Sequence, residues 1–258
     1  MVDRSQTTDT PAAPPVAASV PPSLVVGDGR TVTLISLGGP ATDVVLQRVA
    51  ANIGPAVGRV EAFWGTDWTH DIVVVATFTG AQFSTQAAGV GVDIAAVAVA
   101  DEVDPARRLV TGQRIVLAPG ASGMSTGSLR VVLSHELFHY AARADTAPDA
   151  PTWLTEGVAD YVARPAASVP ARFRTPEALP ADSEFTATGP QLSDAYDRSW
   201  LFCRFIAEQY GPQTLKQLYL RAAAPGRVDA VTAFRDVLHA GPDTLLTQWR
   251  AWLARAST

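Results

Sequence analysis

Short apolar runs and longer amphipathic segments alternate along the first half of the chain. The segments "DIVVVATFT", "DIAAVAVADEV" and "QRIVLAPG" are apolar runs bounded by turn-forming residues, which predicts buried strands. The segment "SLVVGDGRTVTLIS" predicts two more strands around a Gly-Asp-Gly turn. Apolar residues at helical spacing predict a helix over residues 40–65, which Pro55 should kink or divide. The first half therefore mixes helices with a sheet.

The pattern becomes helical from Ser128 onward. "SLRVVLSHELFHYAARA" contains no Gly or Pro and predicts one helix, and "TWLTEGVADYVA" predicts a second, with Thr152 as its N-cap and Pro165 as its stop. A proline-rich loop follows, and then four more helical segments run to the C-terminus. We therefore expect an α+β fold: a mixed sheet with a central helix pair, followed by an all-helical C-terminal lobe.

Composition and charge narrow the range of partners. Apolar residues make up 47% of the 258 residues, the formal net charge is −5, and the chain has no run rich in Lys or Arg. Nucleic acid and anionic membrane are therefore not expected as main partners. The apolar runs are too short to span a bilayer, so we expect no transmembrane segment in this chain. We expect a monomer.

The first 23 residues are rich in Pro, Ala, Ser and Thr, which is typical of a flexible tether. They contain no recognisable signal peptide. The single cysteine, Cys203, excludes an intramolecular disulfide framework and leaves the compartment open. The chain is then either cytoplasmic or an exported or membrane-tethered protein whose signal or anchor is missing from this sequence.

The segment "HELFH" carries the first candidate chemistry. His135 and His139 are four residues apart, so both imidazoles lie on one face of the predicted helix and can bind one zinc ion. Glu136 lies roughly 100° further around the helix. That position suits a base acting on a water molecule better than a third ligand. Two surface histidines would be the ordinary alternative, but the surrounding helix is mostly apolar, and buried imidazoles need partners.

The second predicted helix offers the remaining ligand. Catalytic zinc sites use three protein ligands and one open position. Glu156 follows His139 by seventeen residues, beyond a short loop that reverses the chain. Asp160 lies one turn after Glu156, where it can accept the free ring N–H of His135 and fix its orientation. A solvated helix face is the alternative interpretation of "TEGVAD", but apolar residues surround this segment.

The two segments "HELFH" and "WLTEGVADY" together resemble the gluzincin branch of the HExxH metallopeptidases. This branch includes the thermolysin-like and aminopeptidase N-like catalytic domains, and the nearest resemblance is to the peptidase MA-like group. The resemblance implies a zincin-like lobe over 24–165 and a helical lobe over 166–258. It implies His135, His139 and Glu156 as zinc ligands. It also implies Glu136 as general base and Asp160 as the carboxylate behind the first histidine.

Two further assignments follow from the same resemblance. Tyr196, which opens a predicted helix, matches a tyrosine that stabilises the oxyanion in aminopeptidase-like members; a structural tyrosine at a helix start is the alternative. In such enzymes an extended peptide pairs with an edge strand beside the metal helix. "RIVLAPG" (114–120) precedes that helix, so we expect Ala118 and Gly120 to bind substrate. The metzincin branch is disfavoured, because no third histidine follows at the required spacing.

The predicted activity is zinc-dependent peptide hydrolysis with a glutamate base. A non-catalytic zincin-like domain, which binds a peptide or partner and uses zinc for structure, is the alternative. The presence of Glu136 beside intact ligands favours the enzyme. Zinc-dependent hydrolysis of a non-peptide amide is a third possibility.

Overall fold

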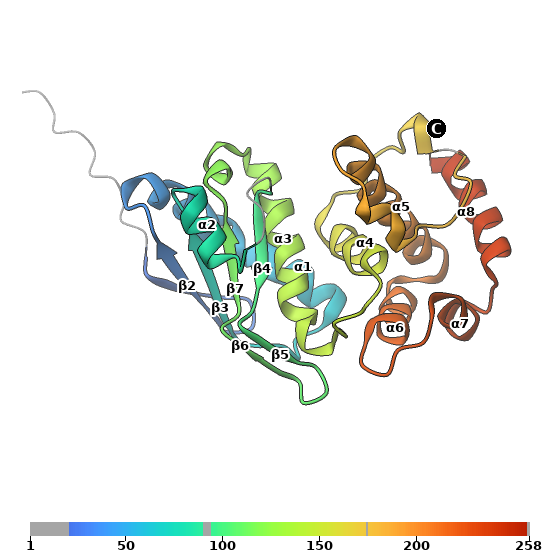
Figure 1. The fold of residues 1–258 in the computed structure, drawn as a ribbon, viewed down its shortest axis with the longest axis horizontal. Helices are drawn as coiled ribbons and strands as arrows, with labels where there is room; N and C mark the ends of the chain where they lie inside the picture. The colour runs from blue at the N-terminus through green and yellow to red at the C-terminus, as the bar shows by residue number, and fades with distance from the viewer. Residues whose placement is uncertain (1–20, 90–93, 174, 257–258) are drawn as a thin grey trace, which may run out of the picture.

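The computed structural model describes residues 21–89, 94–173 and 175–256 (Figure 1). Nearly all of the predicted tether at 1–23 thus lies outside the described residues. The strands are β1 Ser23–Val26, β2 Arg30–Ser36, β3 Asp71–Ala76, β4 Ala96–Val99, β5 Glu102–Asp104, β6 Leu109–Thr111 and β7 Arg114–Leu117. The longer helices are α1 Pro40–Trp64, α2 Gly80–Gln86, α3 Thr126–Ala142, α4 Thr152–Ala163, α5 Pro190–Tyr210, α6 Pro212–Ala223 and α8 Pro242–Ala256. A short helix, α7 Ala230–Ala233, continues into a π-helical turn at Phe234–Leu238.

Five strands form one mixed sheet in the order β1-β2-β3-β7-β4. Strands β2, β3 and β7 are parallel, and β1 and β4 pair antiparallel at the two edges. The α+β class predicted from the sequence is confirmed. The prediction that residues 114–120 form the edge beside the metal helix is wrong, because β4 pairs with the outer side of β7 and takes the edge. The hairpin β5–β6 was not predicted.

Helices cover both faces of this sheet (Figure 1). Helices α1 and α3 pack on one face, against buried strand residues such as Ile72 and Ile115, while Phe83 of α2 packs against Val116 on the other. Pro55 lies inside α1 without dividing it, contrary to one of the two predicted outcomes. Buried residues before and after this proline hold both parts of the helix against the same core.

Helix α4 lies between α3 and α5 and joins the sheet to the C-terminal helices (Figure 1). One cluster of buried hydrophobic residues runs from Val32 in β2 to Leu253 in α8, so the sheet and the C-terminal helices share a core. Thr152 is the first residue of α4 rather than its N-cap, because the preceding Pro151 takes the cap position. Among the described residues, no helix is both long and apolar enough to cross a membrane.

Candidate metal centre

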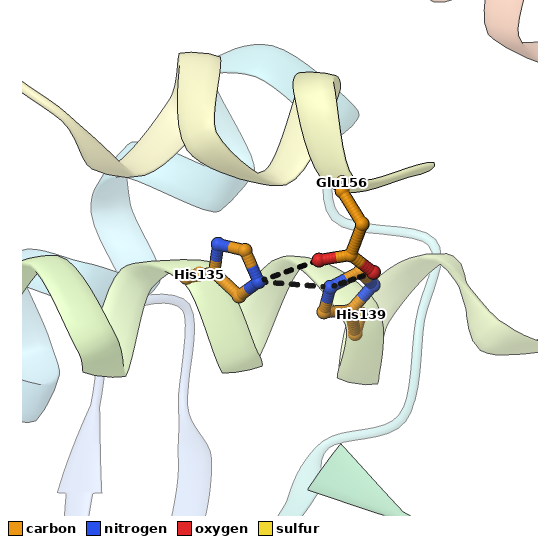
Figure 2. Close-up of side chains that lie close together, drawn as sticks. All are labelled: His135, His139 and Glu156. Carbon is orange, nitrogen blue, oxygen red and sulfur yellow. Dashed lines mark hydrogen bonds and ion pairs between the residues drawn. The ribbon is translucent and has the colours of Figure 1, made fainter. Parts of the chain in front are cut away.

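Helix α3 presents the two predicted histidines toward α4. The side chain of Ser125 accepts a hydrogen bond from the backbone N–H of Ser128 at 3.0 Å, which caps the start of the helix. The helix packs against α1, α4 and strands β4 and β7, which explains why so many of its residues are apolar. His135 and His139 lie on the side that meets Glu156 of α4, as Figure 2 shows.

Four side-chain atoms converge between these helices: one ring nitrogen from each histidine and both carboxylate oxygens of Glu156 (Figure 2). His135 Nε2 lies 3.1 Å from His139 Nε2 and 3.2 Å from Glu156 Oε2, and His139 Nε2 lies 3.4 Å from Glu156 Oε1. The side chains are 16–20% exposed, so the cluster opens to solvent on one side. These three residues form the single group of metal-ligating side chains identified among the described residues.

The spacing of these atoms fits a zinc ion. Ligand atoms at about 2.0–2.1 Å from a tetrahedral zinc lie roughly 3.3 Å from one another. The two imidazole nitrogens lie 3.1 Å apart, and each has one oxygen of the Glu156 carboxylate at 3.2 or 3.4 Å, which is close to this value. Two imidazoles and one carboxylate are also a donor set that zinc prefers in catalytic sites. The residues therefore fit the metal that the sequence predicts.

The charges around the cluster favour a cation. Burial by itself would lower the pKa of His135, but its hydrogen bonds to Asp160 and Glu156 and the nearby Glu136 raise that pKa well above its usual value. Burial by itself would raise the pKa of Glu156, but the two imidazoles hold it well below its usual range. The acidic groups around the imidazoles thus favour positive charge in the cluster, and a metal ion there would take the place of the proton, because a ligating imidazole is neutral.

Asp160 orients the first histidine. Its Oδ1 lies 2.9 Å from His135 Nδ1, and its Oδ2 forms an ion pair with Arg164 at 2.6 Å. A proton on Nδ1 of His135 donates to this carboxylate and leaves the Nε2 lone pair directed at the cluster. Arg164 in turn pairs with Asp197 of α5 at 2.7 Å. The carboxylate is therefore held from two sides.

The loop between α3 and α4 is short, as predicted, and is anchored to the C-terminal helices. The N–H of Ala147 donates to Ala223 O at 2.7 Å, and the hydroxyls of Thr146 and Tyr219 lie 2.8 Å apart. Asp149 pairs with Arg227 at 2.6 Å. These contacts fix the conformation of the loop, which reverses the chain and places Glu156 beside the two histidines.

Glu136 lies against the edge strand β4. Its Oε2 accepts a hydrogen bond from the N–H of Ala98 at 2.7 Å, which leaves Oε1 for another partner. Burial raises the pKa of its carboxyl, and the two nearby imidazoles only partly oppose this. A carboxylate with a raised pKa is a stronger base, as a proton acceptor in catalysis needs to be.

An open cavity of about 510 Å³ lies along this cluster. Its lining combines strand residues 94–98, the three candidate ligands, Glu136, Asp160, Arg164 and Tyr196. Tyr196 is half-buried on α5, and its ring packs edge-on against Phe185 at 5.1 Å. Burial and the nearby acidic groups raise the pKa of its hydroxyl, which therefore stays protonated and can donate.

The two predicted substrate residues do not reach this cavity. Ala118 is buried in the small core under α2, and Gly120 lies in the 3-10 turn Pro119–Gly123. Strand β4 lines the cavity in their place. Sequence reasoning also missed Arg143 and Arg164, two basic residues beside the cluster. Each lies at the C-terminal end of a helix, where basic residues are common, so no pattern in the sequence singled them out.

No protein-family model matches this sequence, and no curated protein matches it either. The case for function therefore rests on the geometry of the site.

Proposed function

We propose that this chain is a zinc-dependent peptidase of the gluzincin type. One observation carries the proposal: the ring nitrogens of His135 and His139 lie 3.1 Å apart, and each has an oxygen of Glu156 at 3.2–3.4 Å, in an open cavity that Glu136 also lines. A zinc ion held by these residues supplies a Lewis acid that polarises a carbonyl and acidifies a water molecule. The alternative of a purely structural zinc is less favoured, because structural sites are closed by four protein ligands.

The edge strand β4 supports binding of an extended peptide. The N–H and C=O of Ala98 both face away from β7, because the first donates to Glu136 and the second accepts from Arg143. Backbone groups alternate in direction along a strand, so those of Ala96 face the same free edge. A substrate that pairs with Ala96 as an added strand lies along the cavity beside the metal ligands.

Glu136 is the proposed general base. Held through Oε2 by Ala98, it accepts a proton from the attacking water through Oε1 while the water oxygen bonds to the carbonyl carbon. It then passes this proton to the amine nitrogen as the C–N bond breaks. Tyr196, protonated and lining the same cavity, donates to the negative oxygen that develops on the carbonyl.

The test compares the wild-type chain, Glu136→Gln and the control Glu177→Gln, an exposed glutamate elsewhere on the surface. All three should hold one zinc per chain. Cleavage of a mixed peptide library should fall about 10²–10⁴-fold in Glu136→Gln only, as expected for loss of a general base. Zinc binding without any cleavage that depends on Glu136 would favour the non-catalytic binding domain instead.

A further inference from the structure

A second cavity, of about 400 Å³, adjoins the candidate metal centre. It shares His139 and Glu156 with the first cavity, so the two lie on either side of these residues. Its other lining residues are Val103 of the β5–β6 hairpin, residues 143, 146–148 and 150 of the loop, and Thr152 and Thr155 of α4. The cleft therefore continues past the metal ligands toward the end of α3.

Arg143 is the one basic residue that lines this second cavity. Its Nη2 donates to Ala98 O at 2.5 Å, and its Nε is buried without a hydrogen-bond partner. Within the described part of the chain, its guanidinium forms no ion pair with a carboxylate. By contrast, Arg164 in the first cavity pairs with both Asp160 and Asp197. Arg143 is thus a half-buried cation without a direct ion-pair partner, and the charge of the nearby Glu136 only partly opposes the effect of burial on its pKa.

The unpaired charge needs compensation. Placing a cation in a partly buried position without an opposite charge is unfavourable. Consistent with this, burial lowers the pKa of Arg143. Glu156 is the one acidic residue in the cavity lining, and it belongs to the metal cluster. Apart from these two residues and the candidate ligand His139, the lining has no ionisable side chain, so Arg143 makes the cavity attractive to an anion.

The shape of the cation indicates which anion. A guanidinium presents its N–H groups as a planar fork, which matches a carboxylate. Arg143 also donates a hydrogen bond to the carbonyl of Ala98 at the free edge of β4. A peptide that pairs with β4 and continues past Ala98 would bring a residue near its cleaved bond into this cavity.

We infer that Arg143 binds a carboxylate of the substrate, so that the enzyme prefers peptides carrying an acidic residue or a free C-terminus at this position. This inference rests on the proposed peptidase function. It adds a specificity that the metal centre alone does not give.

The test uses three matched fluorogenic peptides. The first has one internal aspartate and an amidated C-terminus, the second replaces that aspartate by asparagine, and the third is the asparagine peptide with a free C-terminus. Their kcat/KM values are compared for the wild type, Arg143→Gln, Arg143→Lys and the control Arg107→Gln, an exposed arginine that lines neither cavity. Zinc content and thermal unfolding of each variant verify that it is folded and loaded.

The wild type should prefer one of the two carboxylate peptides over the neutral peptide by roughly tenfold or more, as expected for a charge-assisted pair. Which carboxylate peptide is preferred distinguishes a side chain from a chain end. Arg143→Gln should bring this ratio close to one, Arg143→Lys should keep part of it, and Arg107→Gln should leave it unchanged. A wild type without preference, or a preference that persists in Arg143→Gln, would overturn the inference.

If no peptide is cleaved, the same comparison is made by fluorescence anisotropy on the zinc-loaded chain. Tighter binding of a carboxylate peptide that Arg143→Gln abolishes would support the inference even though the proposed peptidase had failed. Equal binding of all three peptides, or no binding, would overturn it. Cleavage that depends on Glu136 but not on the carboxylate would leave the peptidase standing and overturn the role of Arg143 alone.

Discussion

Replacing Gly157 by alanine would place a methyl group against the backbone of α5. A Cβ at this position would lie 2.7 Å from the carbonyl oxygen of Ser199 and 2.8 Å from Sγ of Cys203. Real Cβ atoms are not found this close to such neighbours, so α4 and α5 would have to separate. Gly157 directly follows Glu156, which means that the same change would shift a candidate ligand.

The magnitude follows from two opposing effects. Inserting a methyl group into a packed core costs about 1–3 kcal/mol. Replacing a helical glycine by alanine recovers roughly 1 kcal/mol at most. The contact with Ser199 involves rigid backbone, so little of the strain can be relieved by a rotamer change. We expect a net loss of about 1–2 kcal/mol, or a fall in Tm of about 2–8 °C for a chain of this size.

Thermal and urea unfolding would measure this loss. The matched control is Gly58→Ala in α1, where a Cβ meets nothing within 4 Å and the change should stabilise by about 0.5–1 kcal/mol. Adding Cys203→Ala to Gly157→Ala should recover only part of the loss, because the contact with Ser199 remains. If Gly157→Ala were as stable as Gly58→Ala, the close packing of α4 on α5 would be refuted.

Two more predictions concern the site. Asp160→Asn should weaken zinc binding by about 10–100-fold, because His135 loses the carboxylate that orients it; competition with a chelator would measure this, and unchanged affinity would contradict the role of Asp160. Tyr196→Phe should lower kcat by about tenfold or more and leave zinc content unchanged, because only the donor to the oxyanion is lost; steady-state kinetics would measure this, and an unaltered kcat would make Tyr196 a structural residue.

The convergence of the candidate metal ligands could be predicted because it depends on local periodicity. The four-residue spacing of His135 and His139 determines that they share a helix face. Glu156 and Asp160 could be added because the same spacing recurs in a second predicted helix, and the intervening loop is long enough to reverse the chain. Helices, strands and the α+β class follow from hydrophobic patterns in the same way.

The order of strands in the sheet could not be predicted, since it depends on pairing between distant segments. Strand β7 precedes the metal helix in sequence, but β4 occupies the edge beside it. The substrate residues expected at Ala118 and Gly120 were therefore misplaced. Gly157 and Arg143 were missed for a similar reason. Gly157 packs against Ser199, which lies 42 residues later in the sequence. Arg143 donates to the carbonyl of Ala98, which lies 45 residues earlier.

The central claim is that His135, His139 and Glu156 bind one zinc ion. The most direct measurement is the zinc content per chain, determined by mass spectrometry after dialysis against metal-free buffer, for the wild type and His139→Ala. We predict one zinc per wild-type chain and a loss of most zinc from His139→Ala, whose fold is verified by circular dichroism. A wild type with far less than one zinc per chain, or a folded variant that keeps it, would contradict the claim.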